Sequence, residues 1–175
     1  MKFKILTLLL CCSLLSCVST KIESNKVAGY EKKVARIYLK VYTTKESREL
    51  LTELTGELKI MLEQRKIQVK WGKIPELDLG EEAAKIQEEM AFFHPDLILT
   101  LKMDDSDKNW SYRPYGGAYY NETNKLSATL GNYPLDQAVW KAIMRSRASL
   151  PGLGAHNIAK KLVSRLELDG MISTQ

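Results

Sequence analysis

Residues 34–175 are predicted to form a single α/β domain around a mixed sheet of about five or six strands. Two observations carry this prediction. From residue 34 to 103, segments in which every second residue is apolar alternate with segments whose apolar residues recur at steps of three and four, which indicates the order strand, helix, strand, helix, strand. From residue 110 to 147 the two-residue alternation recurs with no helical segment between, which indicates antiparallel strands before a final helix.

Each predicted element has its own signal in the chain. Leu54 and Leu58 belong to the helical stripe of the first helix, and His94-Pro95 ends the second, because the residue before a proline is pushed out of the helical region. The apolar run 97–103 predicts a central strand that is buried on both faces. In order, the predicted elements are strand 34–42, helix 46–66, strand 67–71, helix 81–93, strand 97–103, an acidic loop 104–109, a hairpin that turns at 121–124, strand 138–147 and a helix from Ala155 to Asp169-Gly170.

The first seventeen residues resemble the leader of a bacterial lipoprotein. Lys2 and Lys4 form a basic start, and Ile5–Leu15 is an almost unbroken apolar run. Such a run makes roughly 16 Å of helix at ~1.5 Å per residue, which is typical of a signal peptide and too short to span a bilayer. The closing Leu14-Leu15-Ser16-Cys17 resembles a lipobox, which implies cleavage before Cys17 and acyl chains on that cysteine. The alternative is an ordinary secretory leader with an incidental cysteine.

Cleavage at this position predicts three regions: a signal peptide (1–16), a lipidated tether (17–33) and the α/β domain (34–175). The tether is expected because residues 18–33 are mostly polar and charged. The mature chain would have 175 − 16 = 159 residues, and its formal charge would fall from +5 to +3 as Lys2 and Lys4 leave. No basic block suggests nucleic acid. The mature domain would keep no cysteine for a disulfide.

Few residues suggest catalysis or a cofactor. Asp105-Ser106-Asp107-Lys108-Asn109 has a calcium-like spacing, but Trp110 stands where a calcium loop needs glycine and Gly116 where it needs a carboxylate. His94 and His156 have no histidine or cysteine at ligand spacing. Gly152-Leu153-Gly154 lacks the third glycine of a phosphate-binding turn. We therefore expect no catalytic residue, no metal and no cofactor.

Aromatic residues cluster in a predicted loop and hairpin beside glycines. Tyrosine and tryptophan offer broad contact area with a polar group, which favours a recognition surface. The alternative is cross-strand packing within the sheet, which aromatic hairpins use routinely. The candidate recognition residues are Trp110, Tyr112, Tyr115, Tyr119, Tyr120 and Tyr133.

The order of the elements, and the ending Gly154-Ala155-His156-Asn157-Ile158-Ala159-Lys160-Lys161-Leu162 to Asp169-Gly170-Met171-Ile172, resemble small envelope lipoproteins of Gram-negative bacteria. These include the curli-secretion lipoprotein, the amino-terminal domain of the Tol translocation protein and the penicillin-binding-protein activator. The resemblance implies a domain that binds partner proteins or assembles.

We accordingly expect a non-enzymatic lipoprotein, held on the membrane by its lipid, that faces the periplasm and contacts an envelope protein. An aspartate directly after the lipid cysteine resembles an inner-membrane retention signal. This chain has Val18 at that position, which favours the outer membrane. The alternatives are an enzyme acting on cell-wall or carbohydrate material, which paired carboxylates across a cleft would favour, and a small-ligand binder. The sequence leaves the oligomeric state open.

Overall fold

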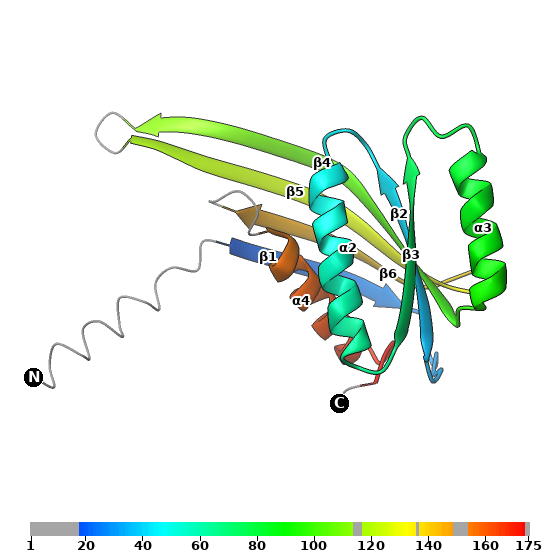
Figure 1. Cartoon of the computed structure of the whole chain (residues 1–175). Coiled ribbons are helices and arrows are strands. Elements are labelled where there is room, and N and C mark those ends of the chain that lie inside the picture. The colour runs from blue at the N-terminus through cyan, green and yellow to red at the C-terminus, as the bar shows by residue number, and fades with distance from the viewer. Residues whose placement is uncertain (1–17, 114–116, 136, 149–153, 174–175) are drawn as a thin grey trace, which may run out of the picture.

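The computed structural model describes residues 18–113, 117–135, 137–148 and 154–173, which form one mixed sheet of six strands with three helices (Figure 1). The strand order across the sheet is β1-β6-β5-β4-β2-β3. The strands are β1 (Val18–Lys26), β2 (Arg36–Thr43), β3 (Gln68–Pro75), β4 (Leu97–Arg113), β5 (Gly117–Asn132) and β6 (Gln137–Ala148), and the helices are α2 (Arg48–Glu63), α3 (Glu81–Phe93) and α4 (Gly154–Leu168). The predicted α/β class, the mixed sheet and the carboxy-terminal helix are confirmed.

The parallel half of the sheet consists of β3, β2 and β4, with β2 between the other two. α2 connects β2 to β3 and α3 connects β3 to β4. Because the two connections lead to opposite sides of β2, right-handed crossovers place their helices on opposite faces of the sheet (Figure 1). The larger core cluster accordingly contains leucines of α2, and the smaller one contains Ile86 and Met90 of α3.

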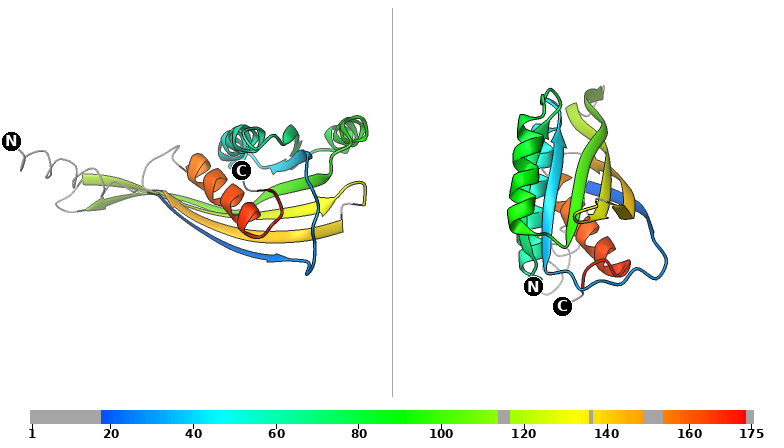
Figure 2. Two further views of the ribbon diagram at one scale, coloured as in Figure 1. Left: turned by 90° about the horizontal axis from the view of Figure 1, so that it is seen from below. Right: turned by 90° about the vertical axis from the view of Figure 1, so that its right-hand side faces the viewer.

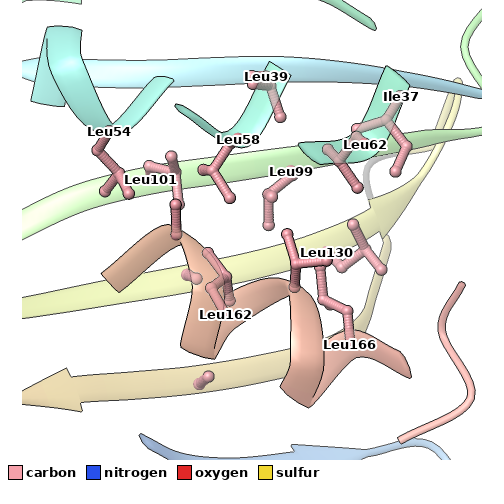
Figure 3. Packing of buried hydrophobic residues seen from close by; sticks show 14 of the residues in the cluster. Ile37, Leu39, Leu54, Leu58, Leu62, Leu99, Leu101, Leu130, Leu162 and Leu166 are labelled. Atoms are coloured by element: carbon pink, nitrogen blue, oxygen red, sulfur yellow. The ribbon is translucent and has the colours of Figure 1, made fainter. Parts of the chain in front are cut away.

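The main core lies between the sheet and the helices α2 and α4. Leu54, Leu58 and Leu62 of α2 have no solvent exposure. They point toward the same space as Leu162 and Leu166 of α4 and the inward-facing residues of β2, β4 and β5 (Figure 3). Four-residue steps in α2 and two-residue steps in the strands bring these side chains to one layer, which is how the sequence pattern specifies the packing.

α3 packs closely against β3 at a glycine. A Cβ on Gly72 would lie 2.6 Å from Ile86 Cγ1 and 2.7 Å from the hydroxyl oxygen of Tyr38. Tyr38 is fully buried, and its hydroxyl donates a hydrogen bond of 2.7 Å to Glu89 Oε2. Only a residue without a side chain therefore fits between β3 and α3 at this position.

The antiparallel half differs from the prediction at the β4–β5 hairpin. β4 continues to Arg113 through a bulge between Met103 and Asp105, so the predicted acidic loop 104–109 is wrong. The predicted turn at 121–124 is also wrong, because these residues pair with β4 inside β5. The connection between the two strands falls in residues 114–116, outside the described residues.

The amino-terminal segment also differs from the prediction. The tether expected over 17–33 is wrong for residues 18–26, which form β1 and pair antiparallel with β6 from Val18 opposite Ala148 to Lys26 opposite Trp140. Cys17 and the signal peptide (1–16) lie outside the described residues. No helix within the described ranges is long and apolar enough to cross a membrane.

One carboxylate fastens β1 to the rest of the domain. Asp169 Oδ2, just after α4, accepts hydrogen bonds from Ser24 Oγ at 2.6 Å, Trp140 Nε1 at 2.7 Å and Arg165 Nε at 3.0 Å. Lys26 Nζ donates to the backbone oxygen of Asp169 at 2.6 Å. These long-range partners explain why a polar segment folds as an edge strand, since among its described side chains Ile22 alone packs against the apolar core.

Candidate interaction surfaces

The apolar core ends at a row of polar side chains that crosses four strands. Thr20, Ser146, Asn124 and Ser106 are register partners in β1, β6, β5 and β4. Thr20 Oγ1 lies 3.2 Å from Ser146 Oγ, and Ser106 Oγ donates to Asn124 Oδ1 at 2.8 Å. We call these four residues the polar row. Asn124 and Ser146 are each 2% exposed, so the row closes the core with satisfied polar groups.

Glu122 lies on β5, two residues beyond Asn124 of the polar row, and is buried. Its carboxylate accepts hydrogen bonds from Tyr120 Oη at 2.9 Å and Asn124 Nδ2 at 3.0 Å, and Lys108 Nζ lies 3.8 Å away. Burial, with the hydrogen bond and charge of Glu122, raises the pKa of Tyr120 to about 12. The Tyr120 hydroxyl therefore stays protonated at neutral pH and can keep donating to this carboxylate.

Beyond Glu122 the β4–β5 hairpin continues past the ends of β1 and β6. We call residues 109–113 and 117–121 the hairpin arm, which projects from the sheet in Figure 1. On it the rings of Trp110 and Tyr120 lie 5.2 Å apart, yet Trp110 remains 62% exposed. Tyr112, two residues further along β4, is 79% exposed. The arm thus combines cross-strand aromatic packing with an exposed aromatic surface.

The structure brings only part of the predicted recognition set together. Trp110, Tyr112 and Tyr120 share the hairpin arm. Tyr119 is in β5 opposite Ser111, but its side chain lies outside the described residues, as does all of Tyr115. Tyr133 is elsewhere, after β5, where it packs against the small core cluster under α3. Its role in recognition stays a prediction.

A second surface is the sheet face that points away from α2 and α4. In Figure 2 the strands β1, β6 and β5 carry no helix on this side. Ile143 lies near its centre and is 39% exposed, beside a shallow hollow of about 370 Å³ lined by residues such as Asn25, Thr129 and Lys141. We call it the helix-free face; it comprises Ser19, Lys21, Glu23, Asn25, Thr123, Lys125, Ser127, Thr129, Lys141, Ile143, Arg145 and Arg147.

Charge on the helix-free face is predominantly positive. Its residues include five basic side chains, Lys21, Lys125, Lys141, Arg145 and Arg147, and one acidic side chain, Glu23, which gives 5 − 1 = +4. Among the described residues, an ion pair joins Arg145 and Glu23 at 3.3 Å. Asp105 of the neighbouring strand β4 is the register partner of Lys125 and adds an acidic side chain beside this face. The net charge remains positive, which favours an acidic partner surface.

A third candidate surface is a hollow of about 360 Å³ where β2 and β3 end, beside β4. Sheets of parallel strands often bind ligands at this edge. Tyr42, Thr44 and Lys102 are among its lining residues. Asp78 also lines it, but its carboxylate accepts from the backbone N–H groups of Glu82 and Ala83 at 3.1 Å and so caps α3.

The residues considered for metal binding do not gather into a site. Asp107 and Asn109 lie in β4, where the Asn109 amide donates to both oxygens of Asp107 at 2.9 and 3.0 Å. His94 ends α3 in a left-handed conformation, and His156 Nδ1 lies 2.9 Å from Glu57 Oε2 at the surface. Of Gly152-Leu153-Gly154, only Gly154 is among the described residues, as the first residue of α4. Within the described ranges no group of three histidine, cysteine or acidic side chains could hold a metal ion.

The polar row and Asp169 were missed by the sequence analysis. One available signal was that Asn124, Glu122 and Tyr120 keep the two-residue step of Leu126, Ala128 and Leu130, and therefore continue the same strand face. No local signal identifies Asp169, because its partners lie up to 145 positions away.

No family model and no curated protein match the chain. Among solved structures it is similar to a PelC dodecamer from Paraburkholderia phytofirmans, with 13% identity and a TM-score of 0.49 over 89% of this chain and 100% of that one. It is also similar to a minor lipoprotein from Acinetobacter baumannii, with 7% identity and a TM-score of 0.39 over 78% and 94% of the two chains. Identity and TM-scores this low leave the function to be argued from the residues of this chain.

Proposed function

We propose that this chain is a lipid-anchored protein of the bacterial envelope that acts by binding a protein partner and not by catalysis. The helix-free face is the observation that carries the proposal. It presents an exposed isoleucine, Ile143, with a hollow beside it and charged side chains around it. Protein interfaces commonly combine an apolar centre with a polar rim in this way.

The charge of the helix-free face indicates the chemistry of the partner. Five basic side chains against one acidic side chain attract an acidic surface and disfavour a basic one. Lys125 and Lys141 lie on neighbouring strands of this face. Reversing the charge of both should weaken association mainly through a slower association rate, which is the usual effect of charges at an interface rim.

The proposed anchor is the lipid on Cys17, with the protein on the periplasmic side of the outer membrane. Several acyl chains hold a protein on a bilayer lastingly, whereas one chain binds only marginally. A Cys17→Ala chain exported with an ordinary cleavable leader should therefore leave the membrane fraction, and the wild-type chain should remain there. A Cys17→Ala chain that sediments with membranes as wild type does would contradict the anchor.

Photo-crosslinking in living cells tests the partner. The photoreactive residue replaces Ile143 on the helix-free face or, as the matched control, Ile60, an isoleucine on α2 that is 54% exposed. We expect one abundant protein to be joined at position 143 and not at 60, and we expect Lys125→Glu with Lys141→Glu to reduce its yield. Equal crosslinking at both positions, or none at 143, would contradict binding at this face.

Specific observations support two alternative functions. The hollow at the ends of β2 and β3, of about 360 Å³, has the size of a small-ligand site, commonly ~300–1,000 Å³, and favours a ligand-binding lipoprotein. Glu49, Glu53 and Glu122 line another hollow, which favours an enzyme, but its volume of about 170 Å³ is below that range. Glu122→Gln distinguishes the enzyme from the partner-binding protein. An enzyme that uses this carboxylate would lose its activity in Glu122→Gln, whereas crosslinking at position 143 would not depend on Glu122.

A further inference from the structure

We propose that the hairpin arm is a second membrane contact, in which Trp110 and Tyr112 lie in the headgroup region of the bilayer that holds the lipid on Cys17. This inference rests on the proposed function, because it takes the lipid anchor as given. It assigns a role to exposed aromatic residues that the helix-free face does not use.

The register of the sheet places Val18, the residue after the proposed lipid cysteine, beside the end of the arm that joins the sheet. Val18 is opposite Ala148 in β6, Ala148 is opposite Glu122 in β5, and Glu122 is opposite Lys108 in β4. The residue after the proposed lipid cysteine therefore belongs to the row directly before the arm, which begins at Asn109 and Asn121. β1 then runs from this row toward the opposite end of the sheet, whereas the arm extends past the row in the other direction (Figures 1 and 2).

The length of the arm matches the depth of the membrane interface. At ~3.3 Å per strand residue, Trp110 is about 7 Å and Tyr112 about 13 Å beyond the row of Val18. Cys17 directly precedes Val18 in the chain, so the proposed lipid would be attached next to this row. Side chains at an interface are commonly buried by ~5–10 Å, and a bilayer holding the lipid of Cys17 would meet the arm at a comparable depth.

The chemistry of the arm also fits the interface. Tryptophan and tyrosine are enriched at the level of lipid headgroups, because their rings are apolar and their N–H or O–H groups can stay hydrated. Trp110 and Tyr112 are 62% and 79% exposed, on a part of the hairpin that no helix covers. Arg147, which lies opposite Ser19 and one residue from the row of Val18, is an exposed basic side chain that can meet lipid phosphates.

A second contact would have a mechanical consequence. A lipid on Cys17 alone lets the domain swivel about one point, whereas the lipid and the arm together fix its tilt. The helix-free face would then be presented to its partner at a constant height and orientation above the membrane. Loss of the arm contact should therefore leave the protein on the membrane but reduce crosslinking at position 143.

Tryptophan quenching tests the contact directly. The lipidated full mature protein is reconstituted in phosphatidylcholine vesicles whose acyl chains carry bromine near the glycerol end, since bromine quenches indole on contact. The chain has three tryptophans: Trp110, Trp140, which is 1% exposed, and Trp71, which lies toward the opposite end of the sheet. We expect strong quenching in wild type and in Trp71→Phe, and a several-fold smaller loss of emission in Trp110→Phe.

The outcomes separate this inference from the anchor on which it rests. Equal quenching of Trp110→Phe and wild type, or no quenching of either, would overturn the arm contact while Cys17 still carries lipid by mass spectrometry. Trp110 that is unquenched in pure vesicles but shielded from acrylamide in native membranes would overturn it in favour of a protein contact. An unmodified Cys17 would overturn both proposals. The Tm of Trp110→Phe should equal that of wild type. An unchanged Tm would show that the variant is folded and that its smaller quenching does not come from unfolding.

Discussion

Removing the carboxylate of Asp169 should destabilise the domain by detaching β1. In Asp169→Ala, the indole N–H of Trp140 loses its acceptor in a residue that is 1% exposed, and the hydroxyl of Ser24 and the guanidinium of Arg165 lose theirs. An unsatisfied buried donor costs about 1–3 kcal/mol, and a hydrogen bond to a charged group contributes about 1.5–3 kcal/mol. Because Arg165 can still donate to Ser24 at 2.6 Å, we expect a total loss of about 3 kcal/mol.

The assay is equilibrium unfolding in urea, followed by circular dichroism. A loss of about 3 kcal/mol corresponds to a fall of roughly 6–12 °C in Tm for a domain of this size. Asp169→Asn keeps an acceptor oxygen without the charge and should lose about half as much, since charge-assisted bonds are roughly twice as strong. Asp107→Ala is the matched control, because among the described residues that exposed carboxylate accepts from Asn109 of its own strand, and its loss should change stability by less than ~0.5 kcal/mol.

The same contact predicts a dependence on pH. Burial would raise the pKa of Asp169, but hydrogen bonds from Ser24 and Trp140 and the charge of Arg165 outweigh it and hold the pKa below the usual 3.8. A lowered folded pKa means that the stabilisation is complete above the unfolded value, near ~3.9, and is lost as pH falls through the folded value. The stability difference between wild type and Asp169→Ala should be constant near neutrality and shrink only below about pH 4. A difference under ~0.5 kcal/mol at pH 7 would refute the reasoning.

Two further predictions concern the packing of the helices. Gly72→Ala should destabilise the domain by about 1–3 kcal/mol in urea unfolding, because its Cβ would lie 2.6 Å from Ile86 Cγ1. Gly56→Ala in α2 is the control and should stabilise the domain by about 0.5–1 kcal/mol, because nothing lies within 4 Å of its Cβ. A change of the same sign in both variants would mean that α3 is packed differently. Leu58→Ala should cost about 2–5 kcal/mol by thermal and urea unfolding, because Leu58 is fully buried between α2 and the sheet, whereas Ile60→Ala, at an exposed position two residues later, should cost under ~1 kcal/mol.

The parallel half of the fold could be predicted because its periodicity reports burial. α3 spans Glu81–Phe93 as expected, and α2 ends within three residues of the predicted bounds at either end. In both helices one stripe meets the sheet and the rest meets water, so the pattern of apolar residues follows directly from the packing.

The hairpin arm could not be predicted by the same signal. Asp104–Asn109 lead from the end of the apolar core into the arm, and their partners in β5 are polar, so no face of this stretch is required to be apolar. A polar run between apolar segments is typical of a loop. Periodicity identifies strands only where one face is buried. The ladder between β4 and β5, and not side-chain burial, maintains the arm.

β1 and the polar row depend on partners that are remote in sequence. In the sequence, Ser24 and Thr20 are typical of a linker. Their hydrogen-bond partners Asp169 and Ser146 come beside them only in the fold. The row joins Thr20, Ser146, Asn124 and Ser106 only through the register of three strand pairs, which the sequence alone does not specify. The aromatic residues of the arm were identified from composition, but their position at the proposed anchor follows only from that register.

The most direct test of the account is the intact mass of the mature protein purified from membranes, with fragmentation of its amino-terminal peptide. We expect a chain of 175 − 16 = 159 residues that begins at Cys17, with a diacylglycerol on the thiol and acylation of the amino group. A chain cleaved elsewhere, or a Cys17 without lipid, would contradict the anchor and with it the orientation of the hairpin arm and the helix-free face.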